Sequence, residues 1–317
     1  MTNFSRVLLS VFAICVLAGC RQEVAKTLTS EPKKSIEKLP SKHLPNLVQV
    51  HPQVLSGGSP EGDEAFAELR SRGVRTVISV DGAKPDVATA KRFGLRYVHL
   101  PHGYDGVPTD RAAELAKAVL DLPGPIYIHC HHGKHRSPAA AAVACVGAGL
   151  IASGDARSVL QLAGTSEHYR GLYDSAAEAR RLDQALLNEL KADFPAVAKL
   201  PAMAEAMVAL EHTHDHLKSF QVANWQPLAR QPDLESAHEA LLLREHYVEL
   251  QRSVAARAEP AGFQDLLQEG EAAAQELEDA LRKPSPVIAS RALEKVSANC
   301  LACHRTYRDL PLREKLR

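Results

Sequence analysis

The sequence predicts two folded regions, an α/β domain with a central sheet flanked by helices over residues 46–182 and an all-α four-helix bundle over residues 183–317. In the first region, short apolar runs rich in Val and Ile alternate with amphipathic stretches, which is the pattern of strands alternating with helices. After Leu182 only long helical stretches follow, separated by breaks that contain proline. Aromatic residues make up only 5% of the chain, so much of the core must be built from Ala, Leu and Val, as in helical bundles.

The composition restricts the class of protein. The 317 residues include 38 basic and 38 acidic side chains, so the formal net charge is zero. The excess of positive charge that favours nucleic-acid binding is therefore missing. Hydrophobic residues at 45% and charged residues at 24% are typical of a globular protein. We expect a folded protein with no nucleic-acid partner.

The N-terminus has the pattern of an export signal. Residues 1–19 contain one positive charge and an apolar run that is too short to span a bilayer comfortably. The residues around Cys20 resemble the lipobox of bacterial lipoproteins, which implies cleavage before Cys20 and a lipid on its thiol. We expect an exported lipoprotein that is anchored in a membrane and faces the periplasm; an ordinary signal peptide or an uncleaved anchor is the alternative. Residues 20–45 are rich in Lys, Glu, Ser and Pro, which predicts a flexible tether.

The elements of the α/β domain lead to a loop that can bind an anion. Strands are expected at residues 47–50, 75–80, 95–100 and 125–130, and helices at 64–73, 110–122 and 139–150. The last strand runs into a short loop that begins at Cys130, and an alanine-rich helix follows, with Ser137 as a plausible N-cap and Pro138 at its first position. A strand, a short loop and a helix start together point several backbone N–H groups at one anion.

This loop also carries side chains suited to phosphate chemistry. Cys130 faces the positive end of the helix together with Lys134 and Arg136, and these charges favour a thiolate, which is the nucleophilic form. The guanidinium fork of Arg136 can bind two phosphate oxygens at once. Ser137 can donate its hydroxyl hydrogen to the sulfur when the sulfur leaves. The sequence therefore predicts a nucleophilic cysteine beneath a bound phosphate.

The remaining loop residues shape the same site. Gly133 allows a tight turn. His131, His132 and His135 are expected to form a positive, pH-dependent lining for an anionic substrate rather than a metal site, since no set of carboxylates or thiolates surrounds them. Cys145, in contrast, lies among Ala and Val with no charge nearby, and we expect it to serve only in packing.

The run His129-Cys130-x5-Arg136-Ser137 resembles the signature of the protein tyrosine and dual-specificity phosphatase superfamily. The resemblance covers about residues 45–175. It implies a phosphatase that hydrolyses phosphate monoesters through a phosphocysteine intermediate and needs no metal or cofactor for that step. The implied partner is a phosphorylated substrate, which could be a protein, a lipid or a small molecule.

The general acid is sought upstream of the cysteine. Residues 100–108 resemble the general-acid loop of the compact dual-specificity phosphatases, which implies that Asp105 protonates the leaving oxygen. Asp110 is the competing carboxylate. It is expected to cap or begin the helix at 110–122, so Asp105 is the preferred candidate.

The C-terminal region carries a second motif. Helices are expected at residues 176–193, 201–223, 233–257, 262–283 and 286–309. Near the end, Cys300, Cys303 and His304 form the Cys-x-x-Cys-His pattern of c-type haem attachment, in which two thiols bond to the porphyrin and the histidine ligates the iron. A redox dithiol would be expected beside a βαβ pattern and a zinc site would need a fourth ligand close in sequence, and neither is found here. The sequence predicts covalent haem c, and the export signal supports it.

The end of the last helix resembles the class II cytochromes c, the cytochrome c′ group, over roughly residues 195–317. In that family the side of the haem opposite the histidine is filled from the first bundle helix, and here Met207, Leu210 and His214 are the candidates, whereas Met203 is expected to pack in the core. An apolar neighbour would leave the iron open to gas ligands, and Met or His would favour electron transfer to a redox partner. The resemblance also allows a homodimer.

Two functional hypotheses follow. In the first, a cysteine-dependent phosphatase is joined to a haem domain that carries electrons or senses redox state or gas, and the haem state can control Cys130. In the second, the protein is a haem c electron carrier or gas sensor, and its phosphatase-like domain only binds anions.

Overall fold

The computed structural model describes residues 36–283 and 285–315. The expected signal peptide, Cys20 and most of the expected tether lie outside these residues, so those predictions stay untested. Within the described part of the chain, no helix is long and apolar enough to cross a membrane.

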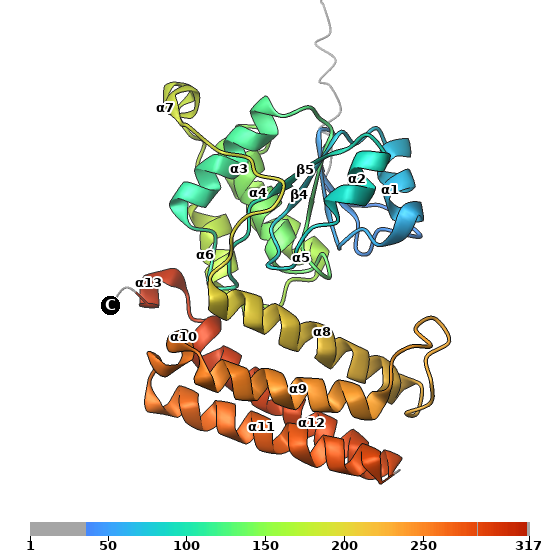
Figure 1. Cartoon of the computed structure of the whole chain (residues 1–317). Coiled ribbons are helices and arrows are strands. Elements are labelled where there is room, and N and C mark those ends of the chain that lie inside the picture. Colours follow the sequence, from blue (N-terminus) through green and yellow to red (C-terminus); the bar gives the residue numbers. More distant parts are fainter. Residues whose placement is uncertain (1–35, 284, 316–317) are drawn as a thin grey trace, which may run out of the picture. The chain divides into compact units, whose positions relative to one another are not determined.

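A six-stranded mixed sheet forms the centre of the α/β domain (Figure 1). Its strands are β1 Glu37–Lys38, β2 Val48–His51, β3 Val54–Gly57, β4 Thr76–Ser79, β5 Arg96–His99 and β6 Ile126–His129. The spatial order is β1-β2-β3-β6-β4-β5. The pairs β1/β2 and β2/β3 are antiparallel, and β6 pairs in parallel with both β3 and β4. The strand that leads into the Cys130 loop is therefore buried in the middle of the sheet.

The two faces of the sheet are covered by separate cores because successive strand side chains point to opposite faces. Figure 1 shows α1 and α2 on one side of the strands and α3 and α4 on the other. Val77 and Tyr127 belong to the smaller core, whereas Ile78 and Ile128, the next residue along each strand, belong to the larger one. The helices of this domain are α1 Gly62–Ser71, α2 Val87–Arg92, α3 Thr109–Asp121, α4 Arg136–Gly147, α5 Ala156–Ala163 and α6 Arg170–Glu178.

Helix α4 is buried along its whole length. It packs against the sheet and against α3, α5 and α6, so every side of it meets another element. Small side chains are needed for such close approach on all sides, which explains the run of alanines that follows Pro138. The buried helix fixes the direction in which the Cys130 loop opens.

The start of the sheet differs from the sequence-based expectation. Residues 36–45 were assigned to a tether, but Glu37 pairs with Gln49 in the sheet and Leu44 is buried in the smaller core. Strands β1 and β3 were not expected, because a two-residue strand and a strand that ends in Gly57 carry almost no periodic signal.

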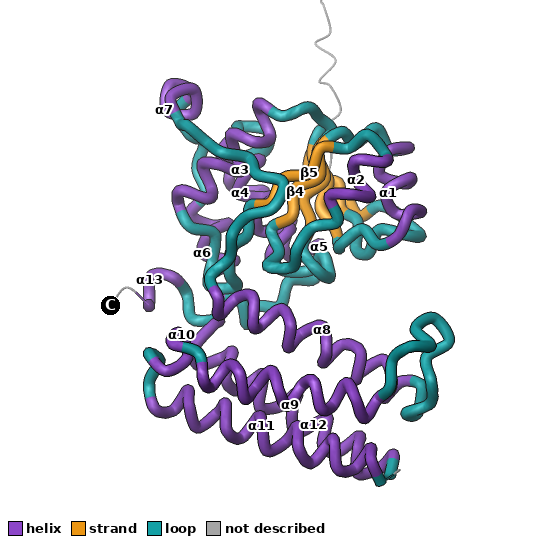
Figure 2. Tube along the Cα trace, in the orientation of Figure 1, coloured by secondary structure: helices purple, strands orange, loops and turns teal. Residues whose placement is uncertain are grey.

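Only helices and loops follow β6 within the described residues, as Figure 2 shows. The helices after α6 are α7 Gln184–Glu189, α8 Ala202–Val222, α9 Ser236–Arg252, α10 Val254–Arg257, α11 Ala261–Arg282, α12 Pro286–Cys303, the π-helix His304–Arg308 and α13 Leu312–Lys315. Helix α11 packs against α9 and α12, and α8 packs against α9. Their shared core includes Leu217, Leu243, Leu277 and Val296. The predicted fold class, an α/β domain followed by an all-α bundle, is confirmed.

The single helix expected over residues 176–193 is wrong. Helix α6 ends at Glu178 and α7 begins at Gln184. Between them the backbone N–H of Leu182 donates to the carbonyl of Gly147 at 2.9 Å. This tertiary hydrogen bond ties the segment to the end of α4 and competes with the helical pattern that the sequence alone suggests.

Candidate functional site

The Cys130 loop lies between the carboxyl end of β6 and the start of α4. Cys130 is only 3% exposed. Helix α4 begins at Arg136 with His135 at its N-cap position, so the expectation that Ser137 caps this helix is wrong. The side-chain oxygen of Ser137 instead lies 3.4 Å from the sulfur of Cys130. Its hydroxyl group donates a hydrogen bond to the carbonyl of Gly57 at 3.0 Å. Ser137 thus touches the candidate nucleophile from the first turn of the helix.

The loop carbonyls are held from outside. The carbonyl of His131 accepts from the N–H of Ser59 at 2.9 Å. The side-chain amide of Asn46 donates to the carbonyl of Gly133 at 2.8 Å, and the hydroxyl of Thr165 donates to that of Lys134 at 2.5 Å. Because a peptide group is planar with its N–H opposite its carbonyl, these contacts turn the N–H groups of the following residues toward the interior of the loop. The result is a concave set of donors suited to an anion.

Gly133 makes this curvature possible. Its φ of 71° lies in the left-handed region, and a Cβ atom there would meet the backbone N of Gly58 at 2.3 Å and the carbonyl carbon of Gly57 at 2.4 Å. Both the conformation and the close approach of backbone require glycine.

Arg136 is buried at the mouth of the loop. It is 6% exposed, and its Nη2 donates to Oδ2 of Asp81 at 3.0 Å. Its Nε–H is also buried but has no hydrogen-bond partner among the described residues. Burial disfavours the charged form, yet the nearby groups Tyr104, Asp81 and Cys130 raise the pKa of Arg136. A permanently charged, buried guanidinium with a free donor is what an anion-binding site needs.

Asp81 is a site residue that the sequence analysis missed. Its Oδ2 accepts both from Arg136 and from the backbone N–H of His131, the latter at 2.5 Å. Burial would raise the pKa of Asp81, but the charge of Arg136 and the hydrogen bonds from the backbone lower it to about 2. Asp81 therefore stays ionised and fixes both the arginine and the beginning of the loop. It lies 49 residues before Cys130 in a turn with no motif of its own, so no local signal pointed to it.

The histidines differ from the expected positive lining. Burial, with the charges of His132 and Lys134, lowers the pKa of His135 to about 4, and burial also lowers the pKa of His132. These two imidazoles are therefore neutral at neutral pH. Only His131 has a raised pKa, and its cause is the hydrogen bond with Asp215 on α8, where Nε2 and Oδ2 lie 3.2 Å apart. Arg136 and the exposed Lys134 carry positive charge at the loop independently of the histidines.

The mouth of the site is lined by aromatic rings. The ring of Tyr104 lies 4.4 Å from the guanidinium carbon of Arg136 and 4.9 Å, centroid to centroid, from the ring of Tyr169. Tyr169 in turn lies 4.6 Å from the ring of His135. These rings form an apolar rim beside a buried positive charge, which suits a substrate with a flat apolar group next to its anion.

The two candidate acids are in different environments. Asp110 lies exposed in the first turn of α3, where its carboxylate accepts from the N–H of Arg111 at 2.8 Å. Helix α3 begins at Thr109, one residue before the expected start, and Asp110 is its second residue. Asp105 is partly buried in the loop before α3, and its Oδ2 lies 2.9 Å from Nζ of Lys315. It makes no hydrogen bond or ion pair to Cys130 or Arg136 in the described part of the chain.

The three residues of the haem motif lie together at the end of α12. Cys303 is buried in the bundle core, Cys300 packs against that core, and His304 begins the π-helix. Burial raises the pKa of both thiols, that of Cys303 to about 11, and lowers the pKa of His304 to about 4. Among residues 36–283 and 285–315, no three His, Cys, Asp or Glu side chains are grouped so as to hold a bare metal ion. Two free thiols and one neutral imidazole on one helix end fit the donor set of haem c.

The candidates for the opposite side of the haem lie on α8. Leu210 is buried in the same core as Cys303, and Met207 and Met203 pack against it. Nε2 of His214 lies 2.9 Å from the hydroxyl of Ser297, one turn before Cys300. Met207, Leu210 and His214 all remain candidates.

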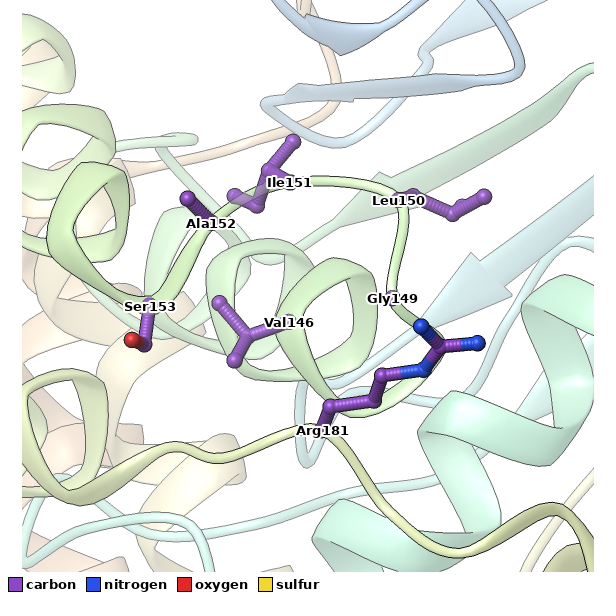
Figure 3. Close-up of a pocket in the computed structure, with 7 residues that line it drawn as sticks. All are labelled: Val146, Gly149, Leu150, Ile151, Ala152, Ser153 and Arg181. Atoms are coloured by element: carbon purple, nitrogen blue, oxygen red, sulfur yellow. The ribbon is translucent and has the colours of Figure 1, made fainter.

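Two cavities in the described part of the chain are lined by neither Cys130 nor Arg136, and by none of Cys300, Cys303 and His304. Figure 3 shows one of about 440 Å³ at the far end of α4, where Arg181 lies beside Gly149 and Leu150. A second, of about 450 Å³, is lined by residues 38–47. The first opens at the C-terminal end of the helix whose N-terminal end holds Arg136, so it plays no part in the anion site.

Neither a protein-family model nor a curated protein matches the sequence. Solved structures match part of it. P. aeruginosa TpbA shows 20% identity and a TM-score of 0.40, with 45% of this chain and 90% of TpbA covered. A TpbA variant in complex with pTyr shows 21% identity and a TM-score of 0.39, with 49% of this chain and 95% of the other covered. The core catalytic domain of the PP-IP phosphatase SIW14 from S. cerevisiae shows 16% identity and a TM-score of 0.34, with 50% and 90% covered. Each of these matches covers about half of this chain.

Proposed function

We propose that the α/β domain is a cysteine-dependent phosphatase that hydrolyses phosphate monoesters. The observation that carries the proposal is the loop itself: Cys130 is buried in it, and the buried Nε–H of Arg136 has no partner among the described residues. From the planarity of the peptide groups, the N–H groups of His132, Lys134 and His135 are expected to face inward. A tetrahedral dianion would satisfy these donors together. No metal is required for this chemistry.

The first step transfers the phosphoryl group to sulfur. An electron pair of the Cys130 thiolate forms the S–P bond while the P–O ester bond breaks, and the leaving oxygen takes a proton from the carboxyl group of Asp105. Arg136 and the loop N–H groups stabilise the charge on the transferred phosphoryl oxygens. The products are a phosphocysteine, the free alcohol or phenol, and an Asp105 carboxylate.

The second step restores the enzyme. A water oxygen attacks phosphorus, its proton passes to the Asp105 carboxylate, and the S–P bond breaks to return the thiolate and release phosphate. The Ser137 hydroxyl, 3.4 Å from the sulfur, can donate to the departing thiolate. To do so it must give up its hydrogen bond to the carbonyl of Gly57.

The rim of the site favours aryl phosphates such as phosphotyrosine among the phosphoesters. The rings of Tyr104, Tyr169 and His135 stand beside Arg136, so a phenyl group can pack against them while its phosphate enters the loop.

Turnover of phenyl phosphate by three proteins tests the proposal. The wild type is expected to hydrolyse it, and Cys130→Ser is expected to have lost at least about 1000-fold in kcat, because a serine hydroxyl is a poor nucleophile without a base. Cys145→Ser is the matched control, since Cys145 is buried in α4 away from the loop, and its activity should stay within about twofold of the wild type. Equal rates for the wild type and Cys130→Ser would reject the mechanism.

A second function is favoured by one observation, the ion pair between Asp105 and Lys315. An acid engaged in this way is compatible with a domain that binds anions without turnover. In that case vanadate or phosphate would bind to the wild type with micromolar affinity by calorimetry, while no phosphate would be released from any ester between pH 5 and pH 8.

We propose in addition that Cys300 and Cys303 attach haem c and that His304 ligates its iron. When bound, the haem would supply one-electron transfer or gas binding. The two thiols would hold the porphyrin covalently, and the neutral imidazole of His304, at the next position of the chain, would ligate the iron. The export signal and a lipid on Cys20 would place the protein on a membrane, facing the periplasm.

Absorption spectra of the protein matured in a host that attaches haem c test this assignment. The wild type should show a haem c spectrum after denaturation that a Cys300→Ser, Cys303→Ser double variant lacks. The absence of covalent haem in the wild type would reject it. Recovery of the wild type in the membrane fraction, and of Cys20→Ala in the soluble fraction, tests the lipid anchor.

A further inference from the structure

The loop that carries Asp105 is bound by the C-terminal segment, which we define as residues 308–315. The backbone N–H of Leu312 donates to the carbonyl of Asp105 at 3.0 Å, and Nζ of Lys315 lies 2.9 Å from its Oδ2. One residue earlier in the same loop, the ring of Tyr104 lies 4.1 Å from the guanidinium carbon of Arg308. Both the backbone and the side chain of the candidate acid are therefore held by the last residues of the chain.

The C-terminal segment is itself fixed to the phosphatase-like domain. Arg170 at the start of α6 makes two hydrogen bonds to Glu314, at 2.9 and 3.0 Å. Arg313 pairs with Asp174 at 3.0 Å, and the carboxylate of Asp309 lies 3.3 Å from His168. Ion pairs of this kind are weak one by one, but a set of them along eight residues orders a segment.

The contact with Lys315 is incompatible with the role of Asp105 as an acid. A general acid must carry the proton that it donates, whereas an ion pair with an ammonium group requires an ionised carboxylate. The carboxylate also folds back over Gly103, where a Cβ atom would meet its Oδ1 at 2.3 Å. The structure thus shows Asp105 turned toward Lys315, while its neighbour Tyr104 is the residue that faces Arg136.

We infer that Lys315 is a positioning residue that holds Asp105 in a resting conformation, and that the C-terminal segment must release Asp105 before it can protonate a leaving group. This inference rests on the proposed phosphatase function and deepens it. The release frees the carboxylate to take a proton from solvent and to turn toward the substrate oxygen; no other bond is made or broken.

The same segment begins four residues after His304, the last residue of the haem motif. The carbonyl of His304 accepts from the N–H of Asp309 at 2.8 Å, so the proposed iron ligand and the beginning of the segment share a hydrogen bond. A shift of His304 would therefore be passed on to Arg308 and Asp309, which contact Tyr104 and His168. The C-terminal segment thus links the Cys-x-x-Cys-His motif to the loop that carries Asp105 through adjoining contacts.

The test compares substrates that differ in their need for an acid. Phenyl phosphate has a basic leaving group and needs a proton, whereas a difluorinated umbelliferyl phosphate releases an acidic phenol and does not. In Lys315→Met, kcat/KM for phenyl phosphate is expected to rise by about 3–10-fold, a small part of the 100-fold or more that general acids contribute. The value of kcat/KM for the fluorinated substrate should stay unchanged, because this quantity does not include the second step, in which Asp105 accepts a proton from water. Lys315→Arg keeps the ion pair and should behave as the wild type.

Two controls separate positioning from a general effect on the fold. Lys295→Met removes an exposed lysine that pairs with Glu276 on the bundle, and it should change neither rate. In an Asp105→Asn background, where no acid is present, Lys315→Met should have no effect on phenyl phosphate. A chain that ends at Pro311 lacks Leu312 and Lys315 together and should reproduce the Lys315→Met result if its thermal unfolding shows that it is folded.

Each outcome is decisive. The inference is wrong if the ratio of the rate on phenyl phosphate to the rate on the fluorinated substrate is the same in Lys315→Met and in the wild type. It is also wrong if the variant is slower than the wild type on phenyl phosphate. An effect of Lys315→Met that persists in the Asp105→Asn background would also overturn it. Failure of the proposed function looks different, because the wild type would then hydrolyse neither substrate faster than Cys130→Ser.

Discussion

The two candidate sites are built in opposite ways. The haem motif consists of neighbouring residues at one helix end, so its geometry follows from local structure. Covalent bonds from the two thiols would then hold the porphyrin. The Cys130 loop takes its shape from groups far away in the sequence, such as Asn46, Asp81 and Thr165. We therefore expect haem attachment to respond mainly to changes in the residues of the motif itself. The second can be disturbed from anywhere in its surroundings.

The largest effect expected from this difference is that of Gly133→Ala. The new Cβ atom would lie 2.3 Å from the backbone of Gly58, and backbone cannot move away cheaply. The loop must open, so kcat should fall by about 100-fold, the effect of misplacing reacting groups by about 1 Å. Rates with phenyl phosphate measure the effect on activity, and urea unfolding measures the effect on stability. Haem attachment should be unaffected.

Gly73→Ala is the matched control for Gly133→Ala. Gly73 has a φ of 81°, similar to that of Gly133, but nothing lies within 4 Å of its Cβ position. Gly73→Ala should lose about 1 kcal/mol of stability, because alanine is strained in the left-handed conformation. Its activity should be that of the wild type. Equal losses of activity in the two variants would show that the close packing of the loop is not what matters.

Asp81→Asn should have the next largest effect. The amide keeps the shape but not the charge that holds Arg136, so kcat/KM should fall by about 10-fold or more, as for other orienting groups. The pKa of Asp81 is lowered to about 2, so its contribution to stability is present above the unfolded value of 3.8 and is lost as pH falls through 2. The free energy of unfolding of the wild type should exceed that of Asp81→Asn by about 2 kcal/mol at pH 6.

Urea unfolding between pH 3 and pH 7 checks the sign of this linkage. The difference between the wild type and Asp81→Asn should be constant above about pH 5 and shrink toward pH 3. A difference that grows on acidification would contradict the assignment of an ionised Asp81 beside Arg136.

The sequence contains much of this architecture because helices and phosphate loops have local signals. The four long bundle helices begin within three residues of their expected starts, since apolar spacing and proline breaks are local signals, whereas α9 and α12 end five and six residues early, at Arg252 and Cys303. Cys130 and Arg136 fall in one loop as expected. Asp81 and the contacts of Asp105 with the C-terminal segment could not be predicted, because they depend on which distant segments the fold brings together. The neutral state of His135 likewise depends on burial that no motif records.

Asp215→Asn tests whether the bundle shapes the loop. Asp215 raises the pKa of His131 through their hydrogen bond, so the variant should bring that pKa back toward 6.5 in an NMR titration. The pair contributes stability below pH 6.5, and this is lost as pH rises through the raised value of His131. Both side chains are partly exposed, at 25% and 29%, so the gain is only a few tenths of a kcal/mol. If the loop is held by its own partners, kcat should not change; a tenfold loss would show that α8 is part of its support.

Tyr247→Phe is expected to have the smallest effect, and it is the sharpest test of the haem side of the comparison. The hydroxyl of Tyr247, on α9, lies 3.4 Å from the sulfur of Cys300 on α12. If local spacing alone sets the haem motif, removing this partner should leave covalent haem attachment complete by mass spectrometry and cost no more than about 1 kcal/mol of stability, the worth of one hydrogen bond. Phe keeps the ring that packs in the bundle core, so any large loss of haem would have to come from the hydroxyl. Such a loss would mean that the haem motif, like the Cys130 loop, depends on a residue more than fifty positions away.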